Sequence, residues 1–371
     1  MKFSCTRSEL QTAVSIAAKA ASAKSPIPAL EGILIETTMN GIKLTGYDLK
    51  KGIYTCIDAN VMEHGSVVLG ARIFGDIVRS LPEGTVTVRT ENNNVFINCE
   101  NSDFSIIGTD ASDYPELPSI DAQTGVKIPQ KLMGDIIRQT IFAVSDSEAR
   151  PVYTGELFEI GEGMLTVVAV DGYRLALRRE PVEGVEGEYS FIVPGSALAD
   201  LEKLCAATDD VLVIHLGSKH ISFTIGETVL ISRRLEGDFL NYRKTVPTSF
   251  RVEVRADRLF LQRTVERVSL IIDDKIKNPV RCIFGENEIR VVCATGLGKA
   301  EDACIVEGDG GNLEIGFNNR YLLDALKAAP AEEICVCLNT GASPCVITPS
   351  DGEQSFLYMI LPVRLRSDLA N

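Results

Sequence analysis

The sequence Leu165-Thr166-Val167-Val168-Ala169-Val170-Asp171-Gly172-Tyr173-Arg174-Leu175-Ala176-Leu177 predicts a strand that enters a tight turn. The β-branched run over 166–170 is typical of a strand, and Asp171 with Gly172 is typical of a turn. Two other segments follow the same plan. They are Ile42-Lys43-Leu44-Thr45 before Gly46-Tyr47-Asp48-Leu49, and Ile289-Arg290-Val291-Val292-Cys293-Ala294 before Thr295-Gly296-Leu297-Gly298. The three segments lie about 125 residues apart, which predicts one unit used three times.

The length and composition are those of a globular protein. The chain has 371 residues, of which 45% are hydrophobic and 24% charged, so that three domains can each bury a core. No apolar run approaches the roughly 18 residues that a membrane-spanning helix needs. The N-terminus, Met1 to Arg7, lacks the apolar region of a secretory signal. We therefore expect a cytoplasmic protein with no membrane partner.

Three domains are expected, over residues 1–119, 120–248 and 249–371, and the predicted fold class is α+β. Each domain consists of two β-α-β-β-β halves. In the first third we expect helices at 8–21 and 71–81, with strands at 3–5, 32–36, 42–45, 52–58, 66–69, 85–90, 94–99 and 104–107. Proline ends the sheets at Tyr114 to Pro118 and at Tyr242 to Pro247, which predicts short stiff linkers there.

Three predicted helices share one formula. Residues 71–79, 130–138 and 319–327 each contain a base, two apolar residues, any residue, an acid, two apolar residues and a second base. At about 100° per residue the apolar positions face one side and the bases the other. The charged side could be an ordinary solvated face with ion pairs worth a few tenths of a kcal/mol.

The distribution of charge favours a more specific interpretation. The net charge of −14 disfavours general attraction to nucleic acid. However, the six predicted helices (8–20, 71–81, 130–144, 196–207, 256–269 and 319–329) hold 11 Lys and Arg against 8 Asp and Glu, whereas the rest of the chain holds 26 against 43. A surface lined by the helices would therefore accept a polyanion more readily than the rest of the exterior.

The ten cysteines are scattered and predict neither disulfides nor a metal site. In a chain without a secretory signal such thiols usually behave as small buried hydrophobes. Cys335-Val336-Cys337 places two thiols on one face of a strand, but no CxxC motif and no nearby histidine completes a ligand set. We expect no metal and no cofactor.

Several motifs together carry a resemblance to a known family. They are Met1-Lys2-Phe3, Pro26-Ile27-Pro28-Ala29-Leu30, Leu44 to Leu49, Ala169 to Leu175, and Tyr358-Met359-Ile360-Leu361-Pro362-Val363-Arg364-Leu365. In this order and spacing, the chain resembles the bacterial DNA polymerase III β subunit, the sliding clamp, over nearly its whole length. The resemblance implies a non-catalytic processivity factor. It also implies a head-to-tail homodimeric ring with helices inside and sheets outside, which encircles duplex DNA without reading its sequence.

The resemblance also implies positions that contact DNA. Lys24 and Arg72 match family contacts, and a loop with Arg150 and Tyr153 resembles a DNA-facing loop in which Pro151-Val152 replaces an aromatic residue. The shared helix formula extends the set by Arg79, Lys131, Arg138, Arg320 and Lys327.

A partner groove between the second and third domains is a further implication. In this family the DNA polymerase III α subunit, the clamp loader, other DNA polymerases and repair proteins insert a short peptide with aromatic or aliphatic anchors. Two positions depart from the family, because Val170 replaces a threonine and Tyr173 a histidine. The matching residues are Tyr153, Val170, Gly172, Tyr173, Arg174, Leu175, Pro247, Met359, Ile360, Leu361, Pro362, Val363 and Arg364.

The family's dimer joins an edge strand of the first domain to one of the third. Phe104 and Ile106 match one side of that interface, and Leu270 and Ile271 match the other. Residues 366–371 extend beyond the family's usual end, and we expect them to be disordered.

Two other functions are weighed against the clamp. Thr295-Gly296-Leu297-Gly298-Lys299 suggests a nucleotide-dependent enzyme, but a P-loop requires Ser or Thr after the lysine and Ala300 stands there. The other alternative is a monomeric peptide-binding scaffold without topological DNA binding.

Overall fold

A computed structural model describes residues 1–120, 125–183, 187–273 and 278–365. The expected disorder of 366–371 therefore falls outside the described residues. The chain forms two compact units, one of residues 1–134 and 196–234, the other of residues 135–195 and 235–371. Each unit is described by itself. Within the described ranges, no helix is long and apolar enough to cross a membrane.

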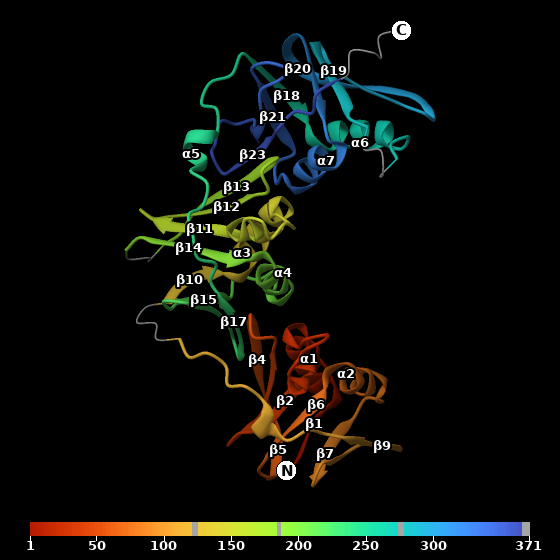
Figure 1. The fold of residues 1–371 in the computed structure, drawn as a ribbon, viewed down its shortest axis with the longest axis vertical. Helices are drawn as coiled ribbons and strands as arrows, with labels where there is room; N and C mark the ends of the chain where they lie inside the picture. Colours follow the sequence, from red (N-terminus) through yellow and green to blue (C-terminus); the bar gives the residue numbers. More distant parts are fainter. Residues whose placement is uncertain (121–124, 184–186, 274–277, 366–371) are drawn as a thin grey trace. The chain divides into compact units, whose positions relative to one another are not determined.

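The first unit contains two antiparallel sheets and two helices that lie side by side (Figure 1). The helices are α1 (Arg7–Ala17) and α2 (Ala71–Ser80). The five-stranded sheet has the order β5 (Asn60–Glu63), β1 (Lys2–Thr6), β7 (Thr85–Glu91), β8 (Asn94–Cys99), β9 (Ser102–Ile107). The eight-stranded sheet has the order β10 (Gly125–Pro129), β15 (Val211–Leu216), β16 (His220–Ile225), β17 (Thr228–Arg233), β4 (Lys51–Asp58), β3 (Gly41–Tyr47), β2 (Gly32–Thr37), β6 (Ser66–Gly70).

One hydrophobic core joins the elements of the first third. Leu10 and Val14 of α1 and Phe74 and Val78 of α2 pack in it with apolar side chains from both sheets. Strand alternation supplies those side chains, because every second residue of β7 and β8 is buried. The amphipathic pattern of the helices thus accounts for how they close this core.

The second unit is built on one ten-stranded antiparallel sheet. Its order is β14 (Tyr189–Pro194), β11 (Gly155–Gly161), β12 (Met164–Val170), β13 (Arg174–Pro181), β23 (Phe356–Ile360), β22 (Cys345–Pro349), β21 (Glu333–Leu338), β18 (Val252–Asp257), β20 (Gly298–Phe317), β19 (Val280–Thr295). Helices α6 (Arg258–Ser269) and α7 (Asn319–Ala328) lie next to each other in this unit (Figure 1). The remaining long helices, α3 (Gln130–Thr140) and α4 (Gly195–Leu204), come from the middle third.

The ten-stranded sheet is apolar on both faces. On β21, Ile334, Val336 and Leu338 belong to the core that α6 and α7 close. Cys335 and Cys337 alternate with them and belong to a second apolar cluster. This second cluster forms the candidate partner groove.

Side chains fix where the helices begin. Thr6 Oγ1 accepts a hydrogen bond from the backbone N–H of Glu9 at 3.3 Å and donates one to the Glu9 carboxylate at 2.5 Å. Asp257 caps α6 by accepting from Phe260 N at 2.7 Å, and Asn318 caps α7 by accepting from Arg320 N at 3.0 Å.

The prediction of six helices is confirmed, and so are the three strand-and-turn segments, which form hairpins. Two elements were missed. The strand β5 precedes β6, and the segment predicted as a stiff linker contains the short helix α5 (Tyr242–Thr245), in which Tyr242 is buried. The formula also placed Ile73 on the packed side of α2, but its side chain is 52% exposed.

Candidate partner groove and charged helix faces

The floor of the groove is a row of side chains that crosses five strands. Val170 pairs with Leu175, Leu175 with Met359, Met359 with Val346, and Val346 with Cys337. Residues paired across an antiparallel sheet point to the same face, so all five belong to one apolar cluster. Strand pairing between β13 and β23 thus unites predicted groove residues that lie about 185 residues apart in the sequence.

The wall of the groove comes from irregular segments. Tyr153, in the short helix η5 (Pro151–Thr154), contacts Phe239 edge to face with ring centroids 5.6 Å apart. Leu240 and Val246 pack against the same cluster. These side chains leave an apolar surface suited to aliphatic or aromatic anchors.

The helix α5 holds this wall to the sheet. Tyr242 Oη donates to Glu159 Oε2 at 2.6 Å, and Arg243 Nη2 donates to the same oxygen at 2.7 Å. Burial first, and then the hydrogen bond to the Glu159 carboxylate, raise the pKa of Tyr242, so its hydroxyl remains a donor at neutral pH.

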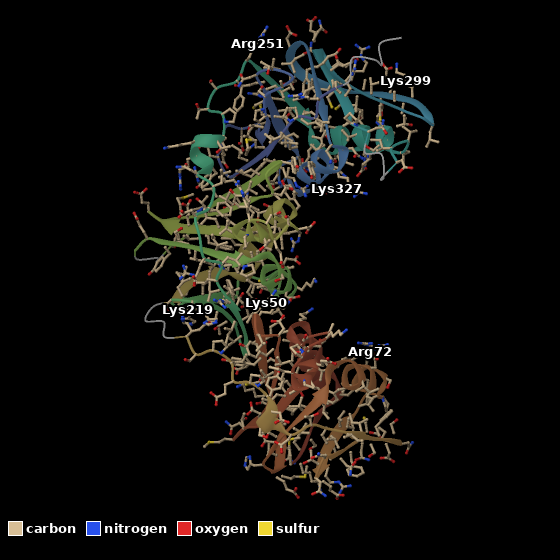
Figure 2. All side chains as sticks on the ribbon, viewed as in Figure 1. Lys50, Arg72, Lys219, Arg251, Lys299 and Lys327 are labelled. Atoms are coloured by element: carbon tan, nitrogen blue, oxygen red, sulfur yellow. The ribbon has the colours of Figure 1, made fainter. Side chains whose placement is uncertain are left out.

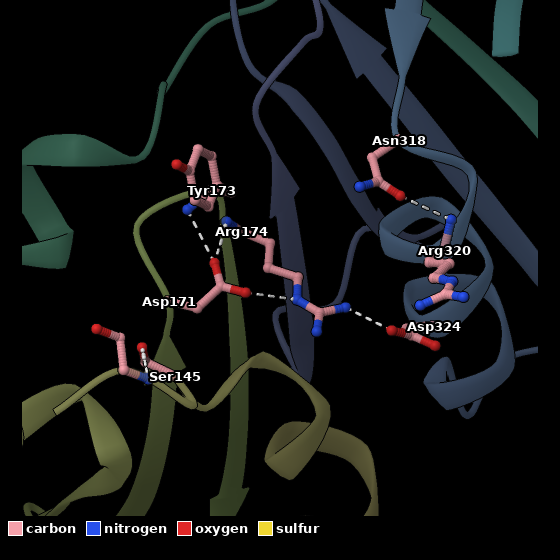
Figure 3. A network of polar contacts seen from close by, with 8 residues as sticks. Ser145, Asp171, Tyr173, Arg174, Asn318, Arg320 and Asp324 are labelled. Atoms are coloured by element: carbon pink, nitrogen blue, oxygen red, sulfur yellow. Dashed lines mark hydrogen bonds and ion pairs between the residues drawn. The ribbon is translucent and has the colours of Figure 1, made fainter. Parts of the chain in front are cut away.

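The turn between β12 and β13 is ordered by one carboxylate (Figure 3). Asp171 Oδ1 accepts from the backbone N–H groups of Tyr173 and Arg174 at 2.8 and 3.0 Å. Gly172 adopts φ +91°, a conformation that favours glycine. The turn presents Tyr173 to solvent with 62% of the side chain exposed.

Arg174 links this turn to α7. Its Nε donates to Asp171 Oδ2 at 2.9 Å, and its Nη1 donates to Asp324 Oδ2 at 2.5 Å (Figure 3). The guanidinium lies 4.4 Å from the ring centroid of Tyr321, which is a cation–π contact. The side chain of Arg174 is only 11% exposed, so screening by solvent is weak at this pair.

The last predicted groove residues follow β23. Leu361 N donates to Tyr173 O and Val363 N donates to Gly316 O, both at 2.8 Å. Ile360 points to the opposite face and belongs to the core beneath α6 and α7, so its assignment to the groove surface was wrong. Alternation along β23 explains the difference, because Met359 and Ile360 are neighbours.

Cys337, Val346, Leu240, Tyr242 and Val246 belong to the groove cluster but were missed by the sequence analysis. Val246 packs against the cluster and precedes Pro247, which is half-buried. The alternating apolar pattern of β21 and β22 was a signal for two buried faces, but the pairing that brings them to β23 is nonlocal.

The bases predicted to contact DNA are exposed on their elements. Figure 2 labels Arg72 on α2 and Lys327 on α7. Arg72, Arg79, Lys131, Arg138, Arg320 and Lys327 are all exposed helix residues, and Lys24 and Arg150 are exposed loop residues. Tyr153 is half-buried and serves both predicted sets, since Arg150 Nη1 lies 3.4 Å from its hydroxyl.

The acid of the shared formula behaves differently in each helix. Asp76 pairs with Arg79 at 3.1 Å and Asp135 with Arg138 at 2.8 Å, as the formula predicts. In α7 the corresponding Asp324 pairs with Arg174, and Lys327 pairs with Glu266 of α6 at 3.3 Å.

The predicted dimer residues lie at sheet edges. Phe104 and Ile106 are on β9, the last strand of the five-stranded sheet, and pack partly into their own core, whereas Ile107 is 81% exposed. Leu270 is 84% exposed just after α6, and Ile271 is half-buried. The first half of β20 pairs with β19, while β18 joins β20 only at Val306 and Glu307. That leaves an edge near Ile305, which is 79% exposed.

The glycine segment at 295–299 is the turn between β19 and β20. Lys299 pairs with Glu301 at 3.0 Å, and a strand follows the turn where a P-loop requires a helix. The nucleotide-enzyme alternative therefore lacks its structural context. Within the part of the chain that the structure describes, no group of three or more His, Cys, Asp or Glu could hold a metal ion.

Comparison with known proteins identifies the architecture. Residues 1–118 match the N-terminal domain of the DNA polymerase III beta subunit, residues 127–241 match its central domain, and residues 243–364 match its C-terminal domain. A beta sliding clamp from Halalkalibacterium halodurans is 35% identical over 384 residues, which cover 98% of this chain and 100% of that protein.

Solved structures agree with these matches. The DNA polymerase sliding clamp from Bacillus subtilis has a TM-score of 0.94 at 30% identity and covers 99% of this chain and 100% of its own. A putative DNA polymerase III beta subunit from Eubacterium rectale has a TM-score of 0.94 at 31% identity, with 98% and 100% covered. The three-domain α+β fold is thus that of a DNA sliding clamp. The chain belongs to the bacterial DNA polymerase III beta subunit family, as the sequence motifs predicted, and its function is that of a sliding clamp.

Proposed function

We propose that two copies of the chain join head to tail into a ring that surrounds duplex DNA and keeps a replicative polymerase on its template. The ring has its helices inside and its sheets outside, reads no base sequence, catalyses no reaction and works in the cytoplasm. Its domains are residues 1–119, 120–248 and 249–371. Its partners dock as short peptides in the apolar groove, and they are the DNA polymerase III α subunit, the clamp loader, other DNA polymerases and repair proteins.

The exposed bases on the helices support the DNA part of this proposal. Phosphate contacts by Lys and Arg attract DNA without reading sequence. Asp76 and Asp135 weaken that attraction on α2 and α3, because each pairs with the second base of its own helix. A lining of this kind attracts the duplex while permitting movement along it, and retention comes from closure of the ring.

The apolar row from Val170 to Cys337 supports the groove part of the proposal. Peptide grooves of this kind combine apolar pockets for anchors with a few polar groups that fix the register. Here Arg174 and the exposed Tyr173 stand at one end of the row, and the backbone of Leu361 is bonded to the same turn.

The sheet edges support the dimer. An unpaired edge strand is an aggregation hazard unless another chain pairs with it. The edge at β9 and the edge at the first half of β20 each carry an exposed isoleucine, Ile107 and Ile305. Pairing these edges between two copies would cover both, and a head-to-tail contact that closes gives a ring.

Retention on circular DNA tests the ring directly. The clamp is loaded by its cognate loader onto a nicked circle, and the bound fraction is measured before and after the circle is cut at a single site. We expect stable binding on the circle and rapid loss from the linear product, with little dependence on sequence. Equal release from both forms, or a protein that is monomeric at micromolar concentration, would favour the peptide-binding scaffold instead.

A further inference from the structure

Two thiols lie together on β21. Cys335 and Cys337 occupy alternate positions of the strand, and their Sγ atoms are 3.5 Å apart and share a hydrogen bond. Residues two apart on a strand have Cα atoms about 6.6 Å apart. That separation falls at the upper end of the range that disulfides span. The pair can therefore be bridged if the strand contracts slightly.

Cys335 is the more reactive thiol of this pair. Its hydrogen bond with Cys337 lowers its pKa, and Arg255 on β18 acts in the same direction, although burial and Glu253 oppose them. The hydrogen bond to Cys335, followed by burial, raises the pKa of Cys337. Burial also raises the pKa of the isolated thiols Cys282 and Cys293. A half-buried thiol with a lowered pKa beside a second thiol is the arrangement typical of oxidisable pairs.

Both thiols face the groove. Cys337 ends the row of floor residues, where it pairs with Val346, and it is 4% exposed. Cys335 pairs with Thr348 one row further along β22 and packs partly buried against the same apolar cluster. A chemical change at either sulfur would alter the surface on which a partner peptide lies.

We propose that Cys335 and Cys337 are an oxidisable dithiol in the groove, at which hydrogen peroxide forms a disulfide that weakens the binding of partner peptides. The modification site stands on the geometry of β21. The effect on peptides rests on the proposed function of the groove.

The chemistry consumes one peroxide. The Cys335 thiolate attacks one peroxide oxygen, the O–O bond breaks, and the departing hydroxide takes a proton to become water. The resulting sulfenic acid is attacked by the sulfur of Cys337, which forms the S–S bond and expels a second hydroxide. That hydroxide takes up the proton that Cys337 loses. Two thiols are oxidised, peroxide is reduced, and two waters leave.

The bridge would disturb the groove because β21 is an interior strand. It is paired with β18 on one side and β22 on the other, so a contraction at Cys335 and Cys337 displaces the residues paired with them. Val346 is the direct partner of Cys337, and Met359 is the partner of Val346. Packed interiors transmit such displacements because they contain few voids.

Mass spectrometry of the full-length protein tests the modification. The reduced protein is treated with hydrogen peroxide, free thiols are alkylated, and the peptides are mapped. We expect a Cys335–Cys337 bridge with the loss of two hydrogen atoms, and in Cys337→Ala a sulfenic acid at Cys335 that dimedone traps. Cys56→Ala, which removes another half-buried thiol, is the control and should oxidise like the wild type. Oxidation of Cys335 no faster than of Cys56 in the wild type would overturn the proposal.

Peptide binding tests the consequence. The probe is a fluorescent peptide of the clamp-binding segment of the cognate replicative polymerase. We expect oxidation to raise its Kd by about tenfold or more, reductant to reverse the change, and Cys335→Ala to resist it. Saturating peptide should also slow the modification of Cys335. Equal affinity before and after bridging would end the regulatory proposal alone. Failure of the peptide to bind the reduced wild type would instead refute the proposed groove.

Discussion

Glu156 is a fully buried carboxyl at the start of β11. Thr140 Oγ1 donates to its Oε2 at 3.1 Å, while Oε1 has no hydrogen-bond partner among the described residues. Burial raises the pKa of Glu156 from 4.5 to about 8, and the hydrogen bond from Thr140 opposes the rise. The folded protein therefore keeps this group neutral at pH 7, whereas the unfolded chain ionises it.

We predict that Glu156→Gln stabilises the protein most at high pH. Below about pH 4.5 both states are protonated, so Glu156 causes no loss of stability. Between about pH 4.5 and 8 the unfolded state alone releases the proton, which lowers the stability of the wild type as the pH rises. Thermal unfolding should show little difference at pH 5 and a gain of roughly 2 kcal/mol at pH 8. Glu188→Gln, at an exposed position, should show no such trend.

At Arg174 we predict a coupled loss of peptide affinity. Arg174→Ala removes the bonds to both Asp171 and Asp324, so the turn that carries Tyr173 loses its support. The Kd of a partner peptide should rise at least about tenfold, and Asp324→Asn should give part of that effect. A double-mutant cycle by fluorescence anisotropy measures the coupling. Arg179→Ala, on the same strand, is the control, and strictly additive effects would contradict the link.

At the level of elements, the helices α2 and α3 differ from α7 in what holds their acids. We predict that Asp76→Asn together with Asp135→Asn makes the clamp move more slowly on DNA. Freeing Arg79 and Arg138 allows up to two more phosphate contacts, each steepening the salt dependence by about 0.9 in log–log slope. Diffusion of the loaded clamp on long DNA, measured against salt, gives this slope.

The control for this prediction is Glu63→Gln, which neutralises an exposed acid on the edge strand β5. Stability should change by only a few tenths of a kcal/mol in either variant, because exposed ion pairs contribute little. Unchanged diffusion of the double variant would mean that these pairs do not moderate DNA contact.

Local patterns predicted most elements of the fold but few of the contacts between them. The helix formula, the Thr6 and Glu9 cap and the glycine turns are all local signals, and the structure contains each of them. The strand β5 was missed because only Val61 in it is even partly buried. The helix α5 was missed because its stability depends on Tyr242 reaching Glu159, which lies far away in the sequence.

The groove shows the same limit more sharply. Family motifs supplied Leu175 and Met359, but Cys337 and Val346 enter the site only through the register of β21, β22 and β23. A shift of one residue in that register would turn every side chain to the other face. The sequence of β23 alone could not tell that Met359 faces the groove and Ile360 does not.

For the whole molecule we predict that Leu270→Glu dissociates the dimer. Leu270 is 84% exposed, and an acid there would bury a charge if the proposed interface forms. Sedimentation at micromolar concentration should show a monomer with unchanged circular dichroism, and Ile107→Glu should act similarly. Met39→Glu, at a 96% exposed apolar position in the hairpin between β2 and β3, should leave the dimer intact. A dimer that survives both changes would exclude this interface.

The pairing of β23 with β13 has a consequence for biosynthesis. Only 11 residues follow Ile360, so β23 is still inside the ribosomal exit tunnel when translation ends. The strand it completes was made about 180 residues earlier. A nascent or truncated clamp thus has no finished groove floor and cannot compete for polymerases. The cell's supply of docking sites then reports completed chains alone.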